Sequence, residues 1–290
     1  TAAIYGQRAG LSCTVFEKYA PGGQIVNSPS IENYPGMYGV SGYDYSMALF
    51  NQAQKLGAEV QFAEVQSVDF SGKTKKVFTT AGDFEAKAVI IATGATAKYL
   101  GLESEEKFRG QGVSACATCD GFFYRKKDVA VVGGGDTACE EATYLASLCN
   151  KVYMIVRRNV FRASQAMQER VFNTPNIEVL WEHQTKEIIG NEMGVTGAIL
   201  KNNEGVERTI DIDGFFLAIG HHPNSDIFRE WIETDAEGYI VTQGKSCKTS
   251  REGIFAAGDV QDPTYRQAIN AAGAGCRAAM DAEKYLAESK

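Results

Sequence analysis

The 290-residue sequence contains no apolar run that approaches the roughly 20 residues needed to span a bilayer, and no signal peptide opens it. Basic residues are outnumbered, 29 Lys and Arg against 36 Asp and Glu, and the net charge of −7 argues against a nucleic-acid backbone as the main partner. Low-complexity segments and solenoid repeats are also missing. With 44% hydrophobic residues, the chain has the composition of a soluble globular protein, and its length favours two domains.

Histidine is scarce, and cysteine is scattered. The seven cysteines are an odd number in a long chain, which excludes a dense secreted disulfide framework and indicates a reducing compartment, most simply the cytoplasm. Five of them lie in apolar or helical stretches and are interpreted as small core residues: Cys13, Cys139, Cys149, Cys247 and Cys276.

The other two cysteines, Cys116 and Cys119, form a C-x-x-C pair in 115-ACATCDG-121. A zinc site needs four ligands, and neither the other cysteines nor the three histidines supply a second pair at metal spacing. A structural staple across two residues is strained. A redox dithiol fits better, with Asp120 placed to move its proton, although an ordinary turn aspartate would occupy the same position.

A glycine cluster follows in 128-DVAVVGGGDTACEEATYLASLCNKVYMIVRR-158, which reads as strand, turn, helix and strand. Gly133 allows the tight turn, Gly135 lets the backbone approach a pyrophosphate, and Ala138 keeps helix and strand close. The pattern therefore predicts a dinucleotide site at this turn.

The residues after the second strand of this unit indicate which dinucleotide binds. An NAD site requires an acidic residue there, whereas the sequence supplies Arg157, Arg158 and Arg162, which suit the 2′-phosphate of NADP. A solvated basic loop is the alternative interpretation.

Residues 1–17 resemble the back half of a second such unit, with a short helix, Gly10 and a strand that ends in Glu17, an acidic residue suited to a ribose hydroxyl. The front strand and glycine turn are not in the sequence, so we expect the chain to be a fragment lacking roughly 15 to 20 residues of a βαβ unit. Two dinucleotide units in one chain predict a flavoprotein in which hydride passes from nicotinamide to FAD and then to the sulfur pair.

Three more buried strands are predicted in 88-AVIIATGA-95, 214-GFFLAIGHHPN-224 and 252-EGIFAAGDVQD-262, the last followed by a helix over 266–286. Small residues on this helix (Ala268, Ala271, Ala272 and Gly275) permit close approach of a flat ligand or of another backbone.

Over nearly its whole length the sequence resembles the bacterial-type low-molecular-weight thioredoxin reductases. The matching stretches are 22-GGQIVNSPSIENYPG-36, 89-VIIATGA-95, 113-VSACATCDGFFYR-125, 133-GGGDTACEEA-142, 157-RRNVFRA-163 and 258-GDVQDPTYRQA-268, in the family's order. The resemblance implies transfer of electrons from NADPH through FAD to thioredoxin, and a homodimer.

The resemblance also implies the roles of individual residues. Cys116 and Cys119 would be the redox-active disulfide, with Cys119 against the flavin and Cys116 attacking thioredoxin, and Asp120 would be the acid/base partner. FAD would be held by the loop from Glu17 to Gln24, including Gly22 and Gly23, and by Asn33, Thr93, Gly94, Ala95, Gly258, Asp259, Arg266, Gln267 and Ala268. NADPH would be held by Gly133, Gly134, Gly135, Asp136, Thr137 and Ala138, with Arg157, Arg158 and Arg162.

The implied fold is α/β, with two Rossmann-like dinucleotide-binding domains, the second inserted into the first. We expect the FAD domain to span 1–113 and 244–290, and the NADPH domain with its C-x-x-C to span 114–243. The sequence departs from the family's pattern at two places: the first strand and glycine turn over the FAD pyrophosphate are missing, which bears on FAD binding, and Val156 stands where the family often has histidine, which bears on the NADPH assignment. The nearest alternative is the reductase component of an alkyl hydroperoxide reductase system, and a zinc-holding nucleotide-binding module is a more distant one.

Overall fold

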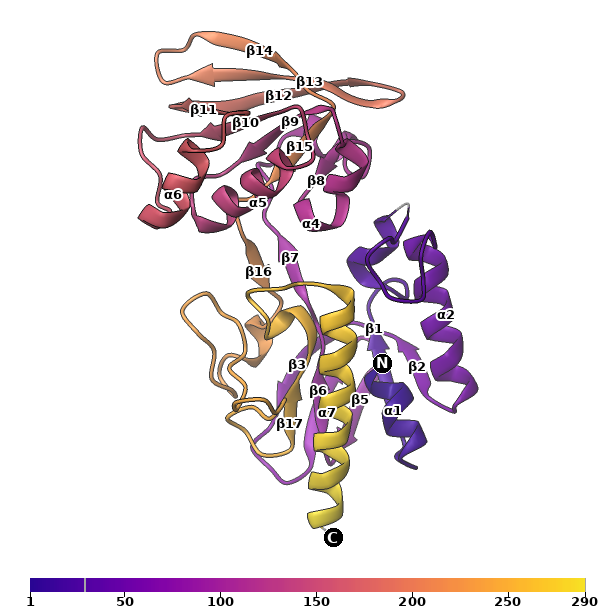
Figure 1. Cartoon of the computed structure of the whole chain (residues 1–290). Helices are drawn as coiled ribbons and strands as arrows, with labels where there is room; N and C mark the ends of the chain where they lie inside the picture. Colours follow the sequence, from indigo (N-terminus) through magenta and orange to yellow (C-terminus); the bar gives the residue numbers. More distant parts are fainter. Residues whose placement is uncertain (29, 290) are drawn as a thin grey trace. The chain divides into compact units, whose positions relative to one another are not determined.

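The computed structural model describes residues 1–28 and 30–289, which fold into two compact units. Unit 1 comprises residues 1–96 and 222–290, and unit 2 comprises residues 97–221. The chain passes from one to the other twice, in β7 (Ala95–Ala97) and β16 (His221–Pro223), and these two strands pair (Figure 1). The boundaries between the two compact units thus lie at 96/97 and 221/222. The predicted boundaries between the FAD and NADPH domains lie at 113/114 and 243/244, and they stay a prediction.

Unit 2 contains a five-stranded parallel sheet with the order β11-β10-β9-β15-β8. The strands are β8 (Val113–Ser114), β9 (Asp128–Val132), β10 (Lys151–Val156), β11 (Ile177–Trp181) and β15 (Gly214–Leu217). The strand order reverses beside β9, because β10 follows it on one side and β15 lies on the other. In open parallel sheets, the carboxyl ends of the strands at such a reversal form the usual ligand site.

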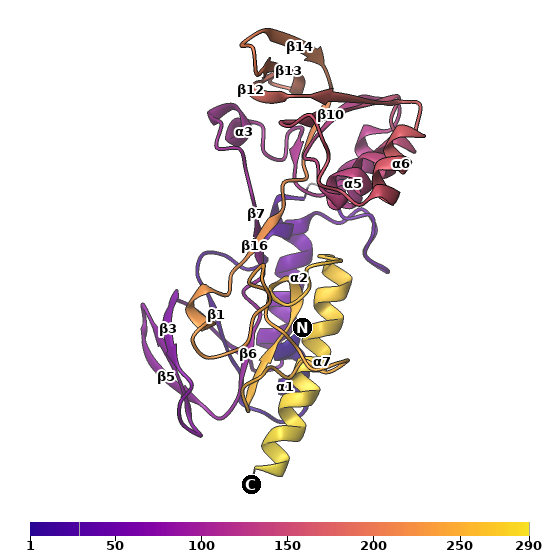
Figure 2. The same ribbon diagram turned by 90° about the vertical axis from the view of Figure 1, so that its left-hand side faces the viewer.

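Both faces of this sheet are covered. On one side lie α5 (Asp136–Ala146) and α6 (Gln165–Phe172); on the other lies an antiparallel sheet of β12 (His183–Asn191), β13 (Gly194–Asn202) and β14 (Glu207–Asp211) (Figures 1 and 2). Side chains alternate across a strand, so Val129 and Val131 pack in the helix-side core, and Ala130 and Val132 pack in the core under β13. The continuous apolar run of β9 is therefore buried on both faces.

Three short helices complete unit 2. They are α3 (Glu103–Lys107), α4 (Ala117–Asp120) and the 3₁₀ helix η2 (Gly121–Tyr124).

Unit 1 contains two short parallel pairs, β1 (Thr14–Glu17) with β2 (Glu59–Phe62) and β6 (Val89–Ile91) with β17 (Ile254–Ala256). An antiparallel sheet is formed by β3 (Val65–Asp69), β4 (Lys75–Thr79) and β5 (Gly82–Ala86). The helices are α1 (Ala2–Arg8), α2 (Gly42–Lys55) and α7 (Ala268–Glu288), with 3₁₀ turns η1 (Gly23–Asn27), η3 (Asp226–Phe228) and η4 (Gly258–Val260).

Strand β17 separates two hydrophobic clusters of unit 1, because its side chains alternate between its two faces. Ile254 and Ala256 face the cluster that includes residues of β3 and β4, whereas Phe255 faces α7, where Ala274 and Ala278 are buried. Ala274 and Ala278 of α7 thus pack against the unit's own strands, whereas Ala268, Ala271 and Ala272, singled out from the sequence, are only half-buried. Gly275 approaches the N-terminus of the chain, since an added Cβ would lie 3.2 Å from the Ala2 nitrogen.

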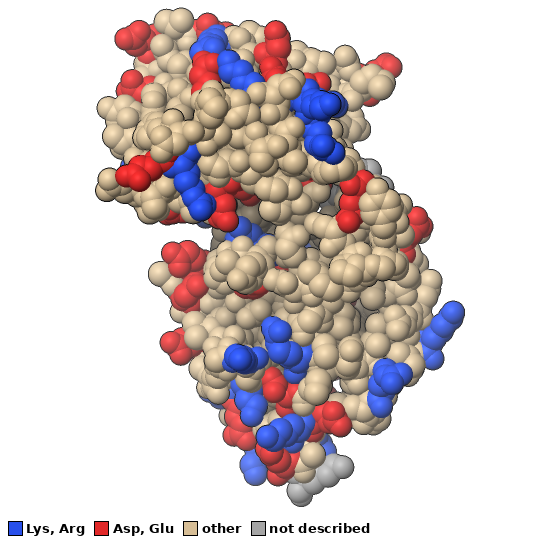
Figure 3. Space-filling view, viewed as in Figure 1, with Lys and Arg blue, Asp and Glu red and all other residues tan. Residues whose placement is uncertain are grey.

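The predicted α/β fold with Rossmann-like parallel sheets is confirmed, and so are the predicted strands at 128–132, 152–156, 214–217 and 254–256 and the helices after Gly135 and Gln267. Among the described residues, no helix is long and apolar enough to cross a membrane. On the face shown in Figure 3, Lys and Arg side chains lie singly or in small groups among Asp and Glu.

Candidate functional site

The two cysteines of the C-x-x-C motif form a disulfide bond in unit 2. Strand β8 ends at Ser114, and after one further residue Cys116 begins the short helix α4 as its N-cap. The backbone nitrogens of Cys119 and Asp120 donate to the Cys116 carbonyl at 3.3 and 3.1 Å, and Ala117 between them is fully buried. A strand end and a helical turn anchored by the buried Ala117 therefore position the pair, with Cys119 exposed and Cys116 half-buried.

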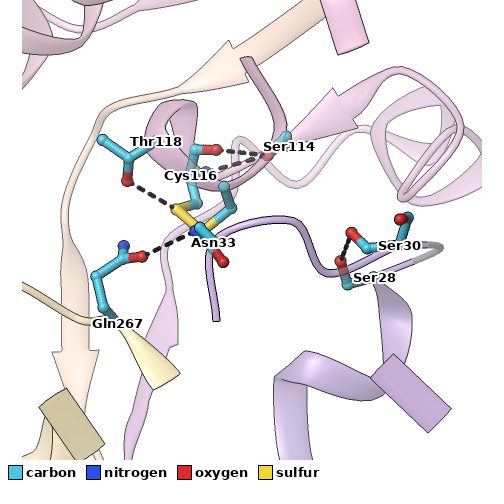
Figure 4. The surroundings of a disulfide bond; sticks show 8 residues. Ser28, Ser30, Asn33, Ser114, Cys116, Thr118 and Gln267 are labelled. Atoms are coloured by element: carbon cyan, nitrogen blue, oxygen red, sulfur yellow. Dashed lines mark hydrogen bonds between the residues drawn. A yellow bond between two sulfur atoms is a disulfide. The ribbon is translucent and has the colours of Figure 1, made fainter. Parts of the chain in front are cut away.

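Two hydroxyl groups lie beside Cys116 (Figure 4). The Ser114 Oγ accepts the Cys116 backbone N–H at 3.1 Å and lies 3.4 Å from the Cys116 carbonyl oxygen. The Thr118 Oγ1 lies 3.5 Å from the Cys116 Sγ. Neither hydroxyl was identified from the sequence, although Thr118 lies inside the C-x-x-C motif and Ser114 lies two residues before it.

Asp120 is the acidic group of this site. Burial raises the pKa of its carboxyl above the ordinary aspartate value, and a hydrogen bond from Ser114 opposes that shift. A carboxyl that keeps its proton to a higher pH is suited to general acid/base work at near-neutral pH. The predicted catalytic residues Cys116, Cys119 and Asp120 are thus brought together in one turn of helix.

The glycine turn of unit 2 connects β9 to α5. Gly133 has φ +147°, and an added Cβ would lie 2.5 Å from the Ala218 carbonyl oxygen and 2.8 Å from the Ala138 Cβ. Gly135 is the N-cap of α5, and an added Cβ there would meet nothing within 4 Å. The first glycine is therefore needed by the fold, whereas the third leaves open space over the helix N-terminus, where an anion binds well.

The arginine-bearing loop is tied to this turn. The backbone nitrogens of Arg162 and Ala163 donate to the Gly134 carbonyl at 2.7 and 3.2 Å. Asp136 Oδ1 accepts the Ser164 backbone N–H at 2.9 Å and its hydroxyl at 2.7 Å, and these bonds lower the Asp136 pKa. The structure therefore brings Arg162 to the glycine turn, with Ser164 as a residue that the sequence did not reveal.

Arg157 and Arg158 follow β10 directly and are exposed, as is Arg162. Val156 is buried beneath the turn, 3.1 Å from where a Cβ on Gly134 would lie. The residue that departs from the family's histidine is thus a packing residue here, and the three guanidinium groups stay available to a phosphate.

In unit 1, the residues predicted to hold FAD lie at loop ends. Glu17 ends β1 and accepts the Tyr19 backbone N–H at 3.1 Å, and Gln24 donates through its side-chain amide to the Ala95 carbonyl. Gly22, with φ +119°, packs too closely against Ser46 to admit a side chain. The Gln24 contact brings the 17–24 loop to the start of β7, the strand that follows Gly94.

Asn224 forms three hydrogen bonds with Thr93 and Gly94. Its side-chain amide donates to the Thr93 carbonyl at 2.9 Å, its backbone nitrogen donates to the Gly94 carbonyl at 2.9 Å, and its own carbonyl accepts the Thr93 hydroxyl at 2.6 Å. Asn224 was not singled out from the sequence. Its partners lie about 130 positions away, so no local pattern could have identified it.

The remaining predicted FAD residues lie between η4 and the start of α7. Arg266 has φ +43°, a conformation that a side chain of its size seldom adopts, and Gln267 is the N-cap of α7. Asn33 Nδ2 donates to Gln267 Oε1 at 3.3 Å (Figure 4). Burial raises the pKa of Asp259, whose ionised form is further disfavoured by Asp262 and favoured by Arg266.

A family model described as pyridine nucleotide-disulphide oxidoreductase matches residues 1–275. The chain belongs to this family. It is 46% identical to the thioredoxin reductase of Rickettsia conorii, covering 99% of this chain and 94% of that protein. It is also 45% identical to the glucosaminate ammonia-lyase of Pseudomonas fluorescens, covering 99% and 92%. Among solved structures it matches thioredoxin reductase from Giardia duodenalis, with a TM-score of 0.94, 41% identity and coverage of 99% and 94%.

Thioredoxin reductases of this pyridine nucleotide-disulphide oxidoreductase family use FAD and NADPH, and the described residues fit both. For NADPH, the open space at Gly135 and the exposed arginines suit a pyrophosphate and a 2′-phosphate. For FAD, Gly273 on α7 also leaves open space, and the desolvated Asp259 carboxyl suits a hydroxyl donor.

The single-cysteine predictions have a mixed outcome. Cys139, Cys149 and Cys247 are buried as expected, and burial raises the thiol pKa of Cys139 and Cys149 to about 11. Cys13 and Cys276 are only half-buried, so the prediction that they are core residues was wrong. Both lie on or beside helices with an exposed face, where an apolar neighbourhood in sequence does not imply burial in space.

Proposed function

We propose that this chain is a thioredoxin reductase, which moves electrons from NADPH through FAD and the Cys116–Cys119 disulfide to oxidised thioredoxin. The observation that carries the proposal is the disulfide itself, placed beside the half-buried Asp120 and in the same unit as the NADP-type glycine turn. The relatives named thioredoxin reductase, similar over almost the whole chain, support the same function.

FAD, when bound, supplies a carrier that takes a two-electron equivalent from NADPH and passes it to the disulfide. Reduction of the disulfide consumes two electrons and two protons and yields two thiols. The Gly133–Ala138 turn and Arg157, Arg158 and Arg162 hold NADPH, whereas the residues of unit 1 described above hold FAD.

The dithiol then acts in two steps. The Cys116 thiolate attacks one sulfur of the thioredoxin disulfide, forming a mixed disulfide and releasing the first thioredoxin thiolate, which takes a proton. The Cys119 thiolate attacks the Cys116 sulfur, which re-forms the Cys116–Cys119 disulfide and releases the second thiolate. Asp120 gives or takes the proton that each step moves. Its position directly after Cys119 supports this role.

Two further features belong to the proposal. Homodimerisation and a cytoplasmic location are supported by the resemblance and by the scattered cysteines, respectively. Sedimentation analysis of the purified chain tests the first.

The test begins with the absorbance spectrum of the purified 290-residue chain, before and after anaerobic NADPH. A flavin spectrum that bleaches supports both cofactors, and thioredoxin reduction is then followed with the bleached protein. A colourless protein is reconstituted with FAD before the same measurements. A longer chain, extended upstream by a strand and a G-x-G-x-x-G turn, then supplies the comparison.

The electron acceptor separates this function from its alternatives. NADPH oxidation that depends on thioredoxin supports the proposal. Oxidation that depends only on the peroxide-reducing component of an alkyl hydroperoxide reductase system supports the alternative, and release of ammonia from glucosaminate without either acceptor contradicts both. Cys276→Ser is the control for loss of an unrelated thiol, because Cys276 is half-buried on α7.

A further inference from the structure

Thr118 lies between the two cysteines of the redox motif, in the short helix α4. The backbone nitrogens of Cys119 and Asp120 donate to the Cys116 carbonyl, and Ala117 is fully buried, so the main chain holds this turn together. Thr118 itself is exposed, and its hydroxyl oxygen lies 3.5 Å from the Cys116 Sγ (Figure 4). The hydroxyl and the sulfur are therefore kept near each other by main-chain hydrogen bonds as well as by the disulfide.

The direction of this hydrogen bond follows from the chemistry of the two groups. A disulfide sulfur carries no proton, so in the oxidised chain the Thr118 hydroxyl donates and the Cys116 Sγ accepts. Reduction converts the same sulfur into a thiol or a thiolate. Hydrogen bonds to an ionised acceptor are roughly twice as strong as those between neutral groups, so this bond is strongest when Cys116 is a thiolate.

A donor beside a thiolate changes the equilibrium between thiol and thiolate. A hydrogen bond that is stronger in the charged form favours that form, and here it acts on the sulfur that the hydroxyl contacts. The thiolate is the nucleophilic form of cysteine. The Thr118 hydroxyl is therefore placed to increase the fraction of Cys116 that can attack a disulfide.

We propose that Thr118 is a positioning residue for the attacking thiol: its hydroxyl donates to the Cys116 Sγ and stabilises the thiolate of Cys116 relative to the thiol. The inference rests on the proposed function in that Cys116 attacks thioredoxin. It deepens that function by giving a residue inside the C-x-x-C motif the task of favouring the first cysteine over the second as the nucleophile.

Other titratable groups near Cys116 lie on α4 and on the elements packed against it. Burial raises the pKa of Asp120 on α4. Tyr124 of η2 has its pKa raised to about 12, by burial first and then by Asp120 and Asp213, so it is neutral throughout the range of the test. Further groups lie at the end of η2 and on α5: Arg125, Asp136, Cys139, Glu140, Glu141 and Tyr144. None of these is changed in the variants below, so their effect on the thiolate is common to all.

The decisive measurement is the pH dependence of the alkylation of Cys116 by iodoacetamide in the full chain carrying Cys119→Ser. This background leaves one thiol in the motif and therefore no coupled titration within it. The thiolate forms a carbon–sulfur bond and iodide leaves, and peptide mass spectrometry identifies Cys116 among the labelled cysteines. Thr118→Val replaces the hydroxyl by a methyl group of similar size, whereas Thr118→Ser keeps the hydroxyl. The reaction requires no bound FAD.

Loss of the hydroxyl is expected to change the alkylation rate in opposite directions at low and high pH. In Thr118→Val the thiolate forms at higher pH, so alkylation is slower below the midpoint, but a more basic thiolate is a better nucleophile, so alkylation is faster above it. One lost hydrogen bond changes the acidity by up to about tenfold. With a Brønsted coefficient of about 0.5, tenfold corresponds to about threefold in rate in each direction. A structural defect would instead lower the rate by one factor at every pH.

The matched variants separate the hydroxyl from side-chain shape. Thr118→Ser is expected to follow the profile of the unchanged residue. Thr118→Ala should match Thr118→Val, and it takes the place of Thr118→Val if that variant does not fold. Coincident Cys116 profiles in the hydroxyl-free variant and in Thr118→Ser overturn the proposal.

The second cysteine supplies the control for selectivity. In the Cys116→Ser background, Cys119 is the remaining thiol of the motif, and Thr118→Val is expected to leave its alkylation profile unchanged. An equal shift at Cys119 would mean that Thr118 does not favour one cysteine over the other, which also overturns the proposal.

Thioredoxin reduction is measured separately, with the unchanged chain loaded with FAD. If the Cys116 profiles cross as expected but no thioredoxin is reduced, the proposed function fails and the pairing of Thr118 with Cys116 stands. If thioredoxin is reduced but the Cys116 profiles coincide, the pairing fails alone.

Discussion

Replacement of Gly133 by alanine tests the division of labour within the glycine turn. At this position φ is +147°, and a backbone held in so sparsely populated a region costs about 1–3 kcal/mol for a residue with a side chain. The new Cβ would also lie 2.5 Å from the Ala218 carbonyl oxygen and 2.8 Å from the Ala138 Cβ. The first neighbour is the backbone that follows β15 and the second lies in the first turn of α5, so neither yields easily, and such overpacking costs about 1–3 kcal/mol.

The two contributions together predict a loss of about 2–6 kcal/mol for Gly133→Ala. In a unit of this size, each kcal/mol lowers the melting temperature by roughly 4 °C, so we expect a decrease of about 8 °C or more, measured by differential scanning calorimetry. The reduced stability is expected in the transition of unit 2, because all three groups involved lie in residues 97–221.

Gly135→Ala is the matched control. Here φ is −97° and the added Cβ meets nothing within 4 Å, so the folded structure accepts it without strain. We expect unchanged or slightly higher stability, together with weaker NADPH binding, because the methyl group occupies the space over the helix N-terminus. An unchanged melting temperature in Gly133→Ala, or an equal loss of stability in both variants, would refute this reasoning.

Four further outcomes are expected. Cys116→Ser should abolish thioredoxin reduction in a coupled assay while NADPH still bleaches the flavin. If the variant still reduces thioredoxin, Cys116 is not the thiol that attacks thioredoxin. Arg158→Gln should raise KM for NADPH roughly tenfold or more with little change for NADH, because one charge-assisted hydrogen bond to the 2′-phosphate is lost; equal changes for both nucleotides would contradict the assignment. Leu145→Ala, in the fully buried face of α5, should cost about 2–5 kcal/mol in chemical denaturation, whereas Tyr144→Ala on the exposed side of the same turn should cost much less. Burial raises the pKa of Asp120 in the folded protein, so its contribution to stability is fully present below the ordinary aspartate pKa and is lost as the pH rises through the folded pKa. Asp120→Asn should therefore flatten this part of the curve of stability against pH. An unchanged curve would show that Asp120 is not desolvated.

The parts of the fold that the sequence predicted are those with local causes. The strand, glycine turn and helix around Gly133 are determined by a continuous apolar run, by glycines that the turn requires and by helical spacing after it, all within about 20 residues. The antiparallel sheets β3–β5 and β12–β14 were not identified. In β14 (Glu207–Asp211) only Ile210 is buried, and in β4 two of the three buried residues are Lys75 and Thr79, so neither strand shows an alternation of apolar residues in the sequence.

The candidate site shows the same limit. The redox pair and the arginine cluster are contiguous motifs and were found. Asn224 and Ser164 were missed, because each acts through partners that are far away in sequence, at Thr93 and Asp136. The boundary between the units also depends on long-range pairing, since β7 and β16 lie more than 120 residues apart and no change of composition marks them.

The two crossings of the chain between the units have a consequence for biosynthesis. Unit 2 is one continuous stretch, residues 97–221, whereas unit 1 needs α7, whose Ala274, Ala278 and Ala282 complete the core around Phe255. On a ribosome the inserted unit can therefore finish folding while its host still waits for the last helix, with the apolar surface around Phe255 uncovered until then. Nonsense mutations that remove α7 would thus leave a folded redox unit attached to an aggregation-prone remainder.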